Sequence, residues 1–295
     1  MGFFASVAHL GISIKNRTGC CVFTNFGDFR KLMEYLYETH LHTRQVSACG
    51  RSSGAEHVRY YHSIGYTGIF VTDHFFRGNC RVPKCLPWRQ RIDLFRKGFD
   101  DAWNEGQKCG LDVFFAWEET FQGDDYLIYG PSPDWLAMHP EAEHWTHREQ
   151  YEAVREEGGC VVQAHPFRCR HYISMITLTP DYVDAIETAN AGNEPIWDAA
   201  AMKYARAFGF YCLCGSDIHY SCPGVLEKEK IFGVGLDYRI HSAFDFAQHI
   251  LQQKPIRLHV PEGRYELTGE ALPLDVYWID GEERRTLARE RWTSP

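Results

Sequence analysis

The chain has 295 residues, of which 44% are hydrophobic and 24% charged, so it is long enough for one large α/β domain or two small ones. Its 31 basic residues face 39 acidic ones, and the resulting formal net charge of -8 disfavours binding to bulk nucleic acid through long-range repulsion. The sequence holds no apolar run of about 18 residues, so no transmembrane helix and no membrane partner are expected.

The cysteines and the two ends of the chain bear on location and domain organisation. The 11 cysteines show no paired Cys-x-x-Cys spacing, which favours reduced thiols in a cytoplasmic protein. Residues 1–32 have neither a helical stripe nor a clean alternation and are expected to form an N-terminal extension. Residues 33–260 are then the barrel domain, and the polar, unpatterned residues 261–295 a C-terminal tail.

From Met33 onward, patterns typical of strands and helices alternate along the chain. The strongest helical pattern spans residues 88–109, where hydrophobic residues expected in the core, from Trp88 to Trp103, recur at three- and four-residue steps before Gly110. Strands are expected at 34–42, 66–74, 111–120, 125–130, 160–165, 183–190, 210–219 and 231–236, and further helices at 55–65, 147–159, 194–209 and 242–253.

Strands that alternate with helices favour parallel pairing with right-handed crossovers. About seven such units in one chain indicate a closed barrel rather than an open sheet. In a parallel barrel the carboxyl ends of all strands lie on one face, and active sites are built on that face.

Five of the expected strands end in histidine or carboxylate side chains. His40 and His42 stand one residue apart, so in a strand their imidazoles share a face, and Asp217 and His219 repeat this spacing. One such pair is explained as well by surface histidines beside a turn, but five coincident strand ends predict a polynuclear metal centre. The other three ends carry Asp73 and His74, Glu118 and Glu119, and His165.

The types of side chain limit which metals fit. Imidazole and carboxylate ligands without cysteine suit zinc, manganese or iron and argue against calcium. Five histidines and at least two carboxylates exceed the needs of one tetrahedral ion, so two or three divalent ions are expected. A carboxylate can bridge two ions, and Glu118 is the candidate for that role.

The chain resembles the PHP (polymerase and histidinol phosphatase) superfamily of metal-dependent phosphoesterases from about residue 33 to the 250s. The resemblance implies a distorted (β/α)7 barrel with two or three metals at the C-terminal ends of the strands. The motifs that carry it, in family order, are His40-Leu41-His42, Thr72-Asp73-His74, Glu118, His165-Pro166 and Ser216-Asp217-Ile218-His219.

The resemblance also implies a distribution of ligands over the metals. Some members carry another histidine or an aspartate shortly after the first motif, where this chain offers Ser47 and Cys49. Some carry a histidine at the start of the fourth strand, where Asp125 is a candidate whose role stays open. By this resemblance His40, His42, Glu118 and Asp217 would hold one metal, His74 and His219 a second, and Glu118 and His165 a third.

The implied activity is that of a cytoplasmic metal-dependent hydrolase of small phosphate esters, acting on a phosphomonoester or a nucleotide. In that mechanism a hydroxide bridging two metals attacks phosphorus. Arg168 is expected to face the substrate, since a guanidinium fork suits phosphate oxygens. Asp73, His219 or a water would pass the proton to the leaving oxygen.

Three other interpretations stay open. An amidohydrolase-type barrel that acts on C–N or lactone bonds also begins with His-x-His, but it would not need the Thr72-Asp73-His74 motif or His219. The full set of strand-end ligands argues against a non-catalytic metal-binding module. The acidic balance argues against an exonuclease that acts on long nucleic acid. The substrate, the native metal and the oligomeric state are not determined by the sequence.

Overall fold

The computed structural model describes residues 34–221, 232–280, 283–287 and 292–293. The expected extension at residues 1–32 lies outside this part of the chain, so its boundary stays a prediction. Among the described helices, none has both the length and the apolar character needed to cross a bilayer.

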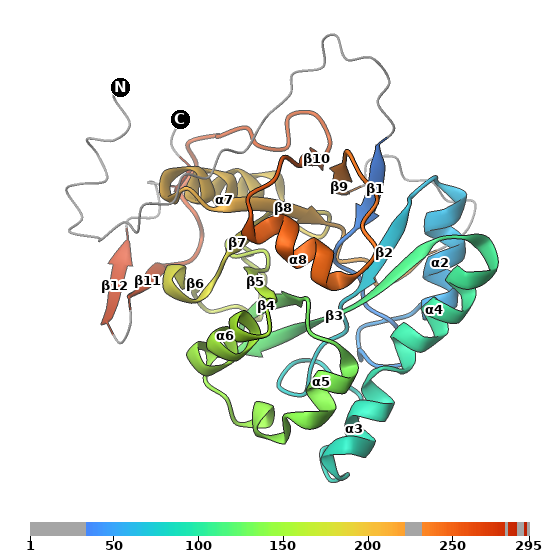
Figure 1. Cartoon of the computed structure of the whole chain (residues 1–295). Helices are drawn as coiled ribbons and strands as arrows, with labels where there is room; N and C mark the ends of the chain where they lie inside the picture. The colour runs from blue at the N-terminus through green and yellow to red at the C-terminus, as the bar shows by residue number, and fades with distance from the viewer. Residues whose placement is uncertain (1–33, 222–231, 281–282, 288–291, 294–295) are drawn as a thin grey trace.

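Nine strands form one strongly curved sheet in the order β10-β9-β1-β2-β3-β4-β5-β7-β8 (Figure 1). The chain beyond β8 closes the curve, because Ile218 pairs in parallel with Leu41 just after β1. The expected barrel is therefore confirmed. The strands are β1 (Tyr35–Glu38), β2 (Gly68–Val71), β3 (Asp112–Phe121), β4 (Asp124–Tyr129), β5 (Cys160–Gln163), β7 (Ala185–Asn190), β8 (Tyr211–Gly215), β9 (Gly233–Leu236) and β10 (Arg257–His259).

The expectation of parallel pairing holds among β1, β2 and β3 and among β5, β7 and β8. It is wrong for β9, which pairs antiparallel with β1 and β10, and for β4. Only Gln122 and Gly123 separate β3 from β4, both with positive φ of 53° and 94°. A two-residue link of this kind makes a hairpin, whereas a parallel pair needs a long crossover. The start of β4, with Asp124 and Asp125, is thereby placed beside the carboxyl end of β3.

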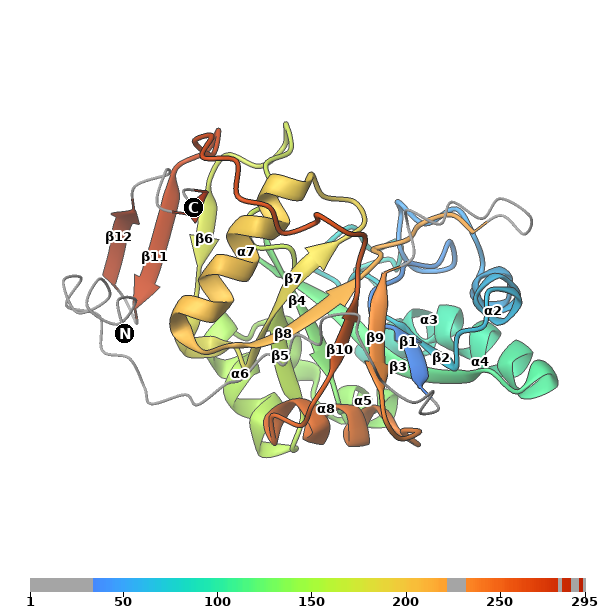
Figure 2. The same cartoon turned by 90° about the horizontal axis from the view of Figure 1, so that it is seen from above.

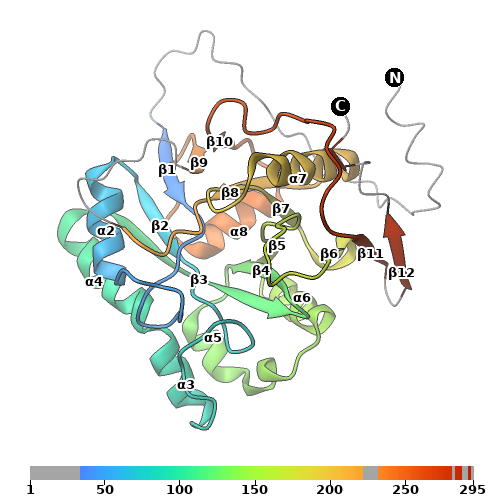
Figure 3. The same cartoon turned by 180° about the vertical axis from the view of Figure 1, so that it is seen from behind.

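Helices surround the barrel, with α2 against α4 on one flank and α7 over β7 and β8 (Figures 2 and 3). The expected single helix at 88–109 is two helices, because the backbone breaks at Arg96 (φ -74°, ψ -4°). Trp103, expected in the core, is 46% exposed. The helices are α2 (Gly54–Ser63), α3 (Trp88–Phe95), α4 (Lys97–Cys109), α5 (Pro133–Met138), η2 (Pro140–Glu143), α6 (His147–Glu156), η3 (Pro180–Tyr182), α7 (Pro195–Phe208) and α8 (Ala243–Leu251).

An apolar core lies among the barrel strands and α8. The Phe70 ring of β2 lies 4.6 Å from the Phe246 ring of α8 and 5.2 Å from the Tyr129 ring of β4, measured between centroids. All three side chains are fully buried. Buried aromatic pairs in such tilted and edge-to-face geometries stabilise a core beyond the area that they bury.

A second, three-stranded sheet beside α7 contains β6 (Ile176–Leu178), β11 (Val276–Asp280) and β12 (Glu283–Leu287) (Figure 2). Trp278 of β11 is buried, and its ring centroid is 4.7 Å from that of Phe208. Residues expected to form a polar tail thus contribute a buried aromatic side chain to the core, although the domain boundaries themselves stay a prediction.

The cysteines of the described chain are mostly free thiols, as expected. Cys212 of β8 departs from that expectation because it is disulfide-bonded. The other cysteine of β8, Cys214, is free and fully buried.

Candidate metal centre

The seven side chains expected to bind metal converge at one end of the barrel. Six of them follow the end of a strand, and Glu118 lies within β3, three residues before its end. Asp217 and His219 come close to His42 through the Leu41–Ile218 pairing. Two of them have left-handed backbone conformations that are rare outside glycine, with φ of 31° at His165 and 53° at Asp217. Such strain persists only where the surrounding structure enforces it, and it clusters at functional sites.

Glu118 lies at the middle of this cluster. Its Oε1 is 3.2 Å from His40 Nε2 and 3.4 Å from His165 Nε2. Its Oε2 is 2.7 Å from His74 Nδ1 and 3.5 Å from His42 Nε2. Both oxygens are buried without a hydrogen-bond partner of normal geometry among the described residues. A buried carboxylate surrounded by ring nitrogens in this way fits a position between cations.

The electrostatics of the cluster agree with that assignment. Burial alone would raise the pKa of Glu118, but positive charge on His74 and His40 outweighs it and holds that pKa well below the usual value. Burial, helped by the neighbouring His74, lowers the pKa of His42 to about 3. His42 is therefore a neutral imidazole, the form that binds metal ions.

The ligand atoms form overlapping groups, each with its members within 4.8 Å of one another. The nitrogen and oxygen donors in these groups suit divalent ions such as zinc, manganese or iron, and overlapping groups fit more than one ion. Asp217 Oδ1 is also 3.0 Å from His42 Nε2. The groups are His40, His42 and Glu118; His40, His165 and Asp217; Glu118, Asp125 and His165; and His42, His74 and His219.

Glu187, in β7, supports the cluster and was not anticipated from the sequence. Its Oε1 is 2.9 Å from His40 Nδ1, and its Oε2 accepts from the backbone N–H of His165 at 2.9 Å. Nδ1 of His40 thus donates to Glu187 while Nε2 faces Glu118, which fixes the ring orientation and tautomer. In the sequence, the feature that could have indicated this role is Glu187 itself, a single acidic residue in the middle of an apolar strand.

Asp73 lies behind the ligands rather than among them. Its Oδ1 accepts from Thr43 N at 2.7 Å and from Ser47 Oγ at 2.6 Å, and its Oδ2 accepts from Thr43 Oγ1 at 2.7 Å. Ser47 Oγ in turn is 3.3 Å from His42 Nδ1. Burial raises the pKa of Asp73 to about 6 despite these hydrogen bonds. The arrangement orients His42, and the expected proton-transfer role of Asp73 stays a prediction.

Arg168 is 7% exposed and donates to the protein itself. Its Nη2 donates to Asp217 Oδ2 and to Asn190 Oδ1, both at 2.8 Å, and its Nε donates to Asn193 Oδ1 at 2.8 Å. These bonds hold the Asp217 carboxylate in place. The expected contact of Arg168 with substrate stays a prediction.

His219 is the ligand candidate with the most exposed side chain, at 32%. Its Nδ1 is 2.7 Å from the backbone oxygen of Asp217, so Nδ1 donates there and Nε2 is left for a metal or a substrate. The Cys49 thiol lies beside His219 and His74. Burial alone would raise the pKa of the Cys49 thiol, but these two imidazoles lower it to about 7.

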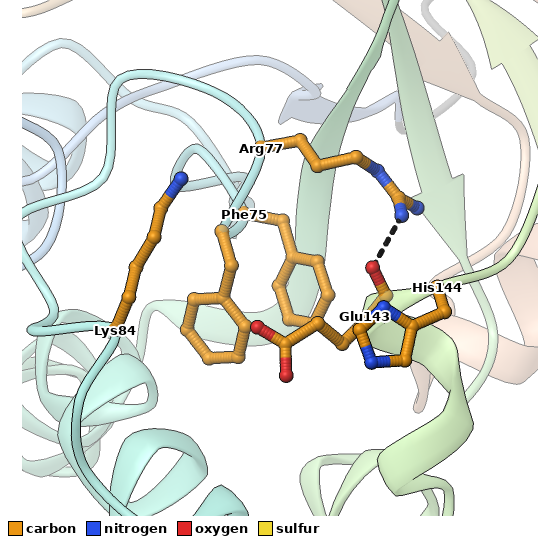
Figure 4. A pocket seen from close by; sticks show the side chains of 6 residues that line it. Phe75, Arg77, Lys84, Glu143 and His144 are labelled. Atoms are coloured by element: carbon orange, nitrogen blue, oxygen red, sulfur yellow. Dashed lines mark hydrogen bonds between the residues drawn. The ribbon is translucent and has the colours of Figure 1, made fainter.

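Glu119, the next residue along β3, points to the opposite face of the strand, as alternation requires. Its Oε2 is 3.2 Å from Arg77 Nη2. Arg77, Phe75, Lys84 and other residues line a pocket of about 220 Å³ there (Figure 4). The dashed line in Figure 4 joins Arg77 to Glu143, whose backbone oxygen accepts from Nη1 at 2.8 Å. The segment after His74 thus lines one side of a pocket whose other side contains Glu143 and His144.

Comparison with known proteins identifies relatives only at the level of fold. No model of a protein family matches the chain, and no curated protein matches it. Among solved structures, a two-domain protein of Bacteroides vulgatus that contains a predicted PHP-like metal-dependent phosphoesterase is 15% identical, with a TM-score of 0.56. The match covers 80% of this chain and 67% of that one.

Two further structures have lower scores. PsfC from Pseudomonas syringae is 13% identical with a TM-score of 0.49, over 79% of this chain and 93% of that one. An amidohydrolase from Chromobacterium violaceum is 13% identical with a TM-score of 0.44, over 75% and 97%. Scores at this level do not discriminate between a phosphoesterase and an amidohydrolase.

Proposed function

We propose that this chain, which has the fold of a PHP-like phosphoesterase domain, is a metal-dependent hydrolase of small phosphate esters. The observation that carries the proposal is the buried Glu118, whose two unpartnered oxygens lie 2.7–3.5 Å from nitrogens of four histidines. Burying an ionised carboxylate costs several kcal/mol unless cations accompany it. We therefore attribute the burial of this charged carboxylate to bound cations that compensate it.

Divalent ions bound at this face supply an activated water and neutralise charge on phosphoryl oxygens. The chain's own residues hold the donors in place for that task. Glu187 orients His40, Ser47 orients His42, and Arg168 holds Asp217. Each support fixes one ligand, so the donor geometry is set before substrate arrives.

His219 is the proposed proton donor to the leaving oxygen; in that role its Nε2 faces the substrate and is not a metal ligand, because its Nδ1 donates to the Asp217 backbone oxygen. Its side chain is 32% exposed, whereas Asp73 is buried and its oxygens accept hydrogen bonds from Thr43 and Ser47. Arg168 is proposed to add positive charge beside the phosphoryl group. Direct contact would come from its Nη1, because Nε and Nη2 serve protein acceptors.

The net charge of -8 supports a small phosphorylated substrate rather than a long nucleic acid. The native metal among zinc, manganese and iron, and a cytoplasmic location, stay predictions.

The test is a substrate panel on the full chain loaded separately with zinc, manganese or iron. Hydrolysis of phosphomonoesters or nucleotides that is lost in Glu118→Gln supports the proposal. Hydrolysis confined to amides or lactones would replace it with the amidohydrolase interpretation. Stoichiometric metal binding without turnover of any substrate class would identify a non-catalytic metal-binding module.

A further inference from the structure

A hydrogen-bonded network behind the metal centre includes the β7–α7 turn, at residues 190–193. Two asparagines of this turn hold Arg168, because Asn190 Oδ1 and Asn193 Oδ1 each accept from its guanidinium at 2.8 Å. Asn190 Nδ2 also donates to Glu187 Oε2 at 3.0 Å. Arg168 and Glu187 each hold one ligand of the metal centre, so this turn contacts the supports of two ligands.

Asp198, in the first turn of α7, holds the β7–α7 turn from the other side. Its Oδ2 accepts from the backbone N–H of Asn190 at 3.1 Å, and its Oδ1 accepts from Asn193 Nδ2 at 2.8 Å. Because the amide nitrogen of Asn193 is bonded to Asp198, its amide oxygen is the atom that faces Arg168. The carboxylate thus fixes the direction in which the Asn193 side chain points.

Arg264, which lies just beyond β10 in the chain, binds this turn at three points. Its Nε donates to Asp198 Oδ2 at 2.6 Å, and its Nη2 donates to the backbone oxygens of Asn190 and Asn193 at 2.8 and 2.6 Å. The ion pair is nearly shielded from water, since the Arg264 side chain is 11% exposed and that of Asp198 1%. One planar guanidinium thus joins the carboxylate to both backbone oxygens, a geometry that a lysine ammonium does not reproduce.

The network determines where the remaining nitrogen of Arg168 lies. Its Nε and Nη2 are bonded to protein acceptors, so Nη1 is the atom left for a phosphoryl oxygen. The position of Nη1 follows from the two asparagines, and theirs follows from Asp198 and Arg264. A displacement of about 1 Å that originates far from the chemistry can lower a rate about 100-fold.

We infer that Arg264 is a positioning residue for the proposed reaction, and that it acts on Arg168 through the β7–α7 turn. A residue of the segment expected to be a C-terminal tail, 261–295, thereby sets the geometry of the phosphoryl-binding side of the metal centre. The inference rests on the proposed phosphoesterase activity and adds to it a residue that acts from behind the ligands.

The test is a double-mutant cycle on the full, metal-loaded chain, with a phosphate ester that the wild type hydrolyses. Arg264→Ala should lower kcat/KM by about tenfold or more, because the Arg168 guanidinium is no longer held in place. In the Arg168→Ala background the same substitution should change kcat/KM by less than about twofold, because the group through which it acts is gone. The Ki of inorganic phosphate as a competitive inhibitor should follow the same pattern. Arg257→Ala, which removes an arginine with a 39% exposed side chain from β10, is the control expected to match the wild type.

Arg264→Lys is the second variant, because alanine leaves the buried Asp198 carboxylate without its cation and can prevent folding. Lysine keeps the charge but cannot donate in a fork. This variant should keep the melting temperature and metal content of the wild type, and should lower kcat/KM only in chains that retain Arg168.

An equal loss of kcat/KM in both backgrounds, wild-type activity in the Arg264 variants or wild-type activity in Arg168→Ala overturns the inference and leaves the proposed hydrolase intact. Loss of bound metal from Arg264→Ala but not from Arg168→Ala does the same. A wild-type chain that hydrolyses no phosphate ester overturns both.

Discussion

At the scale of single residues, one step along β3 separates two carboxylates with different environments. Glu118 faces four histidines. Glu119 faces Arg77 and also accepts from Gln150 Nε2 at 3.3 Å. Burial raises the pKa of Glu119 to about 7 despite the Arg77 charge. Two adjacent residues of the same type therefore have separate roles, which can be tested one at a time.

Glu118→Gln should lower the bound metal, because a neutral amide is a far weaker ligand than a carboxylate and cannot bridge two cations. The matched control is Glu119→Gln, which should keep its metal, since a glutamine amide is a close replacement for a carboxyl group with a pKa near 7. Elemental analysis of the two purified variants measures the difference. Full metal content in the first variant and loss in the second would show that the wrong carboxylate was assigned.

Glu187→Gln should weaken metal binding by about 10- to 100-fold, the usual effect of removing a partner that orients a histidine ligand. The physical reason is the 2.9 Å contact of Glu187 with His40 Nδ1, which keeps Nε2 as the ligand nitrogen. Competition with a fluorescent chelator measures the Kd for zinc. Glu152→Gln, on the exposed face of α6, is the control expected to bind like the wild type. Equal affinities in both variants would rule out the positioning role.

At the scale of elements, α4 supports the metal face through its first turn. Gly98 lies against Thr43 and Asp73, the pair that holds Ser47 and thereby His42. A Cβ at this position would collide with the Thr43 hydroxyl and the Asp73 carboxylate. Gly98 is thus needed because α4 packs closely against Thr43 and Asp73, and not because a turn requires a glycine there.

Gly98→Ala should lower the free energy of unfolding by about 1–3 kcal/mol, as expected for overpacking. Helix propensity alone predicts the opposite sign, since alanine favours a helix over glycine by about 1 kcal/mol. Urea unfolding of the variant measures which effect dominates, with Asn104→Ala on the exposed side of α4 as the control within about 0.5 kcal/mol. A stabilised Gly98→Ala chain would contradict the close packing of α4 on the Thr43 loop.

At the scale of the whole molecule, the proposed ions join segments that are far apart in the chain. His42 and Asp217 belong to the two strand ends where the barrel closes, and their side-chain atoms are 3.0 Å apart. Bound ions would hold this closure and balance the buried carboxylates. Their removal leaves Glu118 paired only with histidines, and Asp217 with histidines and Arg168.

Chelation should therefore lower the melting temperature. An ion present at about 100 times its Kd stabilises the folded chain by about 2.7 kcal/mol, if the unfolded chain does not bind it. Thermal unfolding with and without a chelator at one pH measures the shift, and the Glu118→Gln variant should show a much smaller one. An identical melting temperature in both conditions for the wild type would mean that the ions do not contribute to closure.

Local patterns in the sequence were sufficient for the barrel and for the convergence of the strand-end ligands. The two-residue period of a strand places His40 and His42 on one face, and alternating strands and helices place the other strand ends beside them. The same two-residue period predicts that the Glu118 side chain points toward the histidines, since β3 is uninterrupted over residues 112–121. These features depend on neighbours in the chain, so the sequence alone determined them.

Only the tertiary structure decided the direction of β4, the burial of Trp278 and the support of the ligands by Glu187, Ser47 and Arg168. A carboxylate such as Glu187 is 147 residues from His40 along the chain, and no local period relates the two. Whether a polar side chain contacts a ligand, the substrate or another part of the protein depends on which distant segment packs against it. That choice is made by the closure of the barrel as a whole, because burial in its interior forces each polar group to find a partner there.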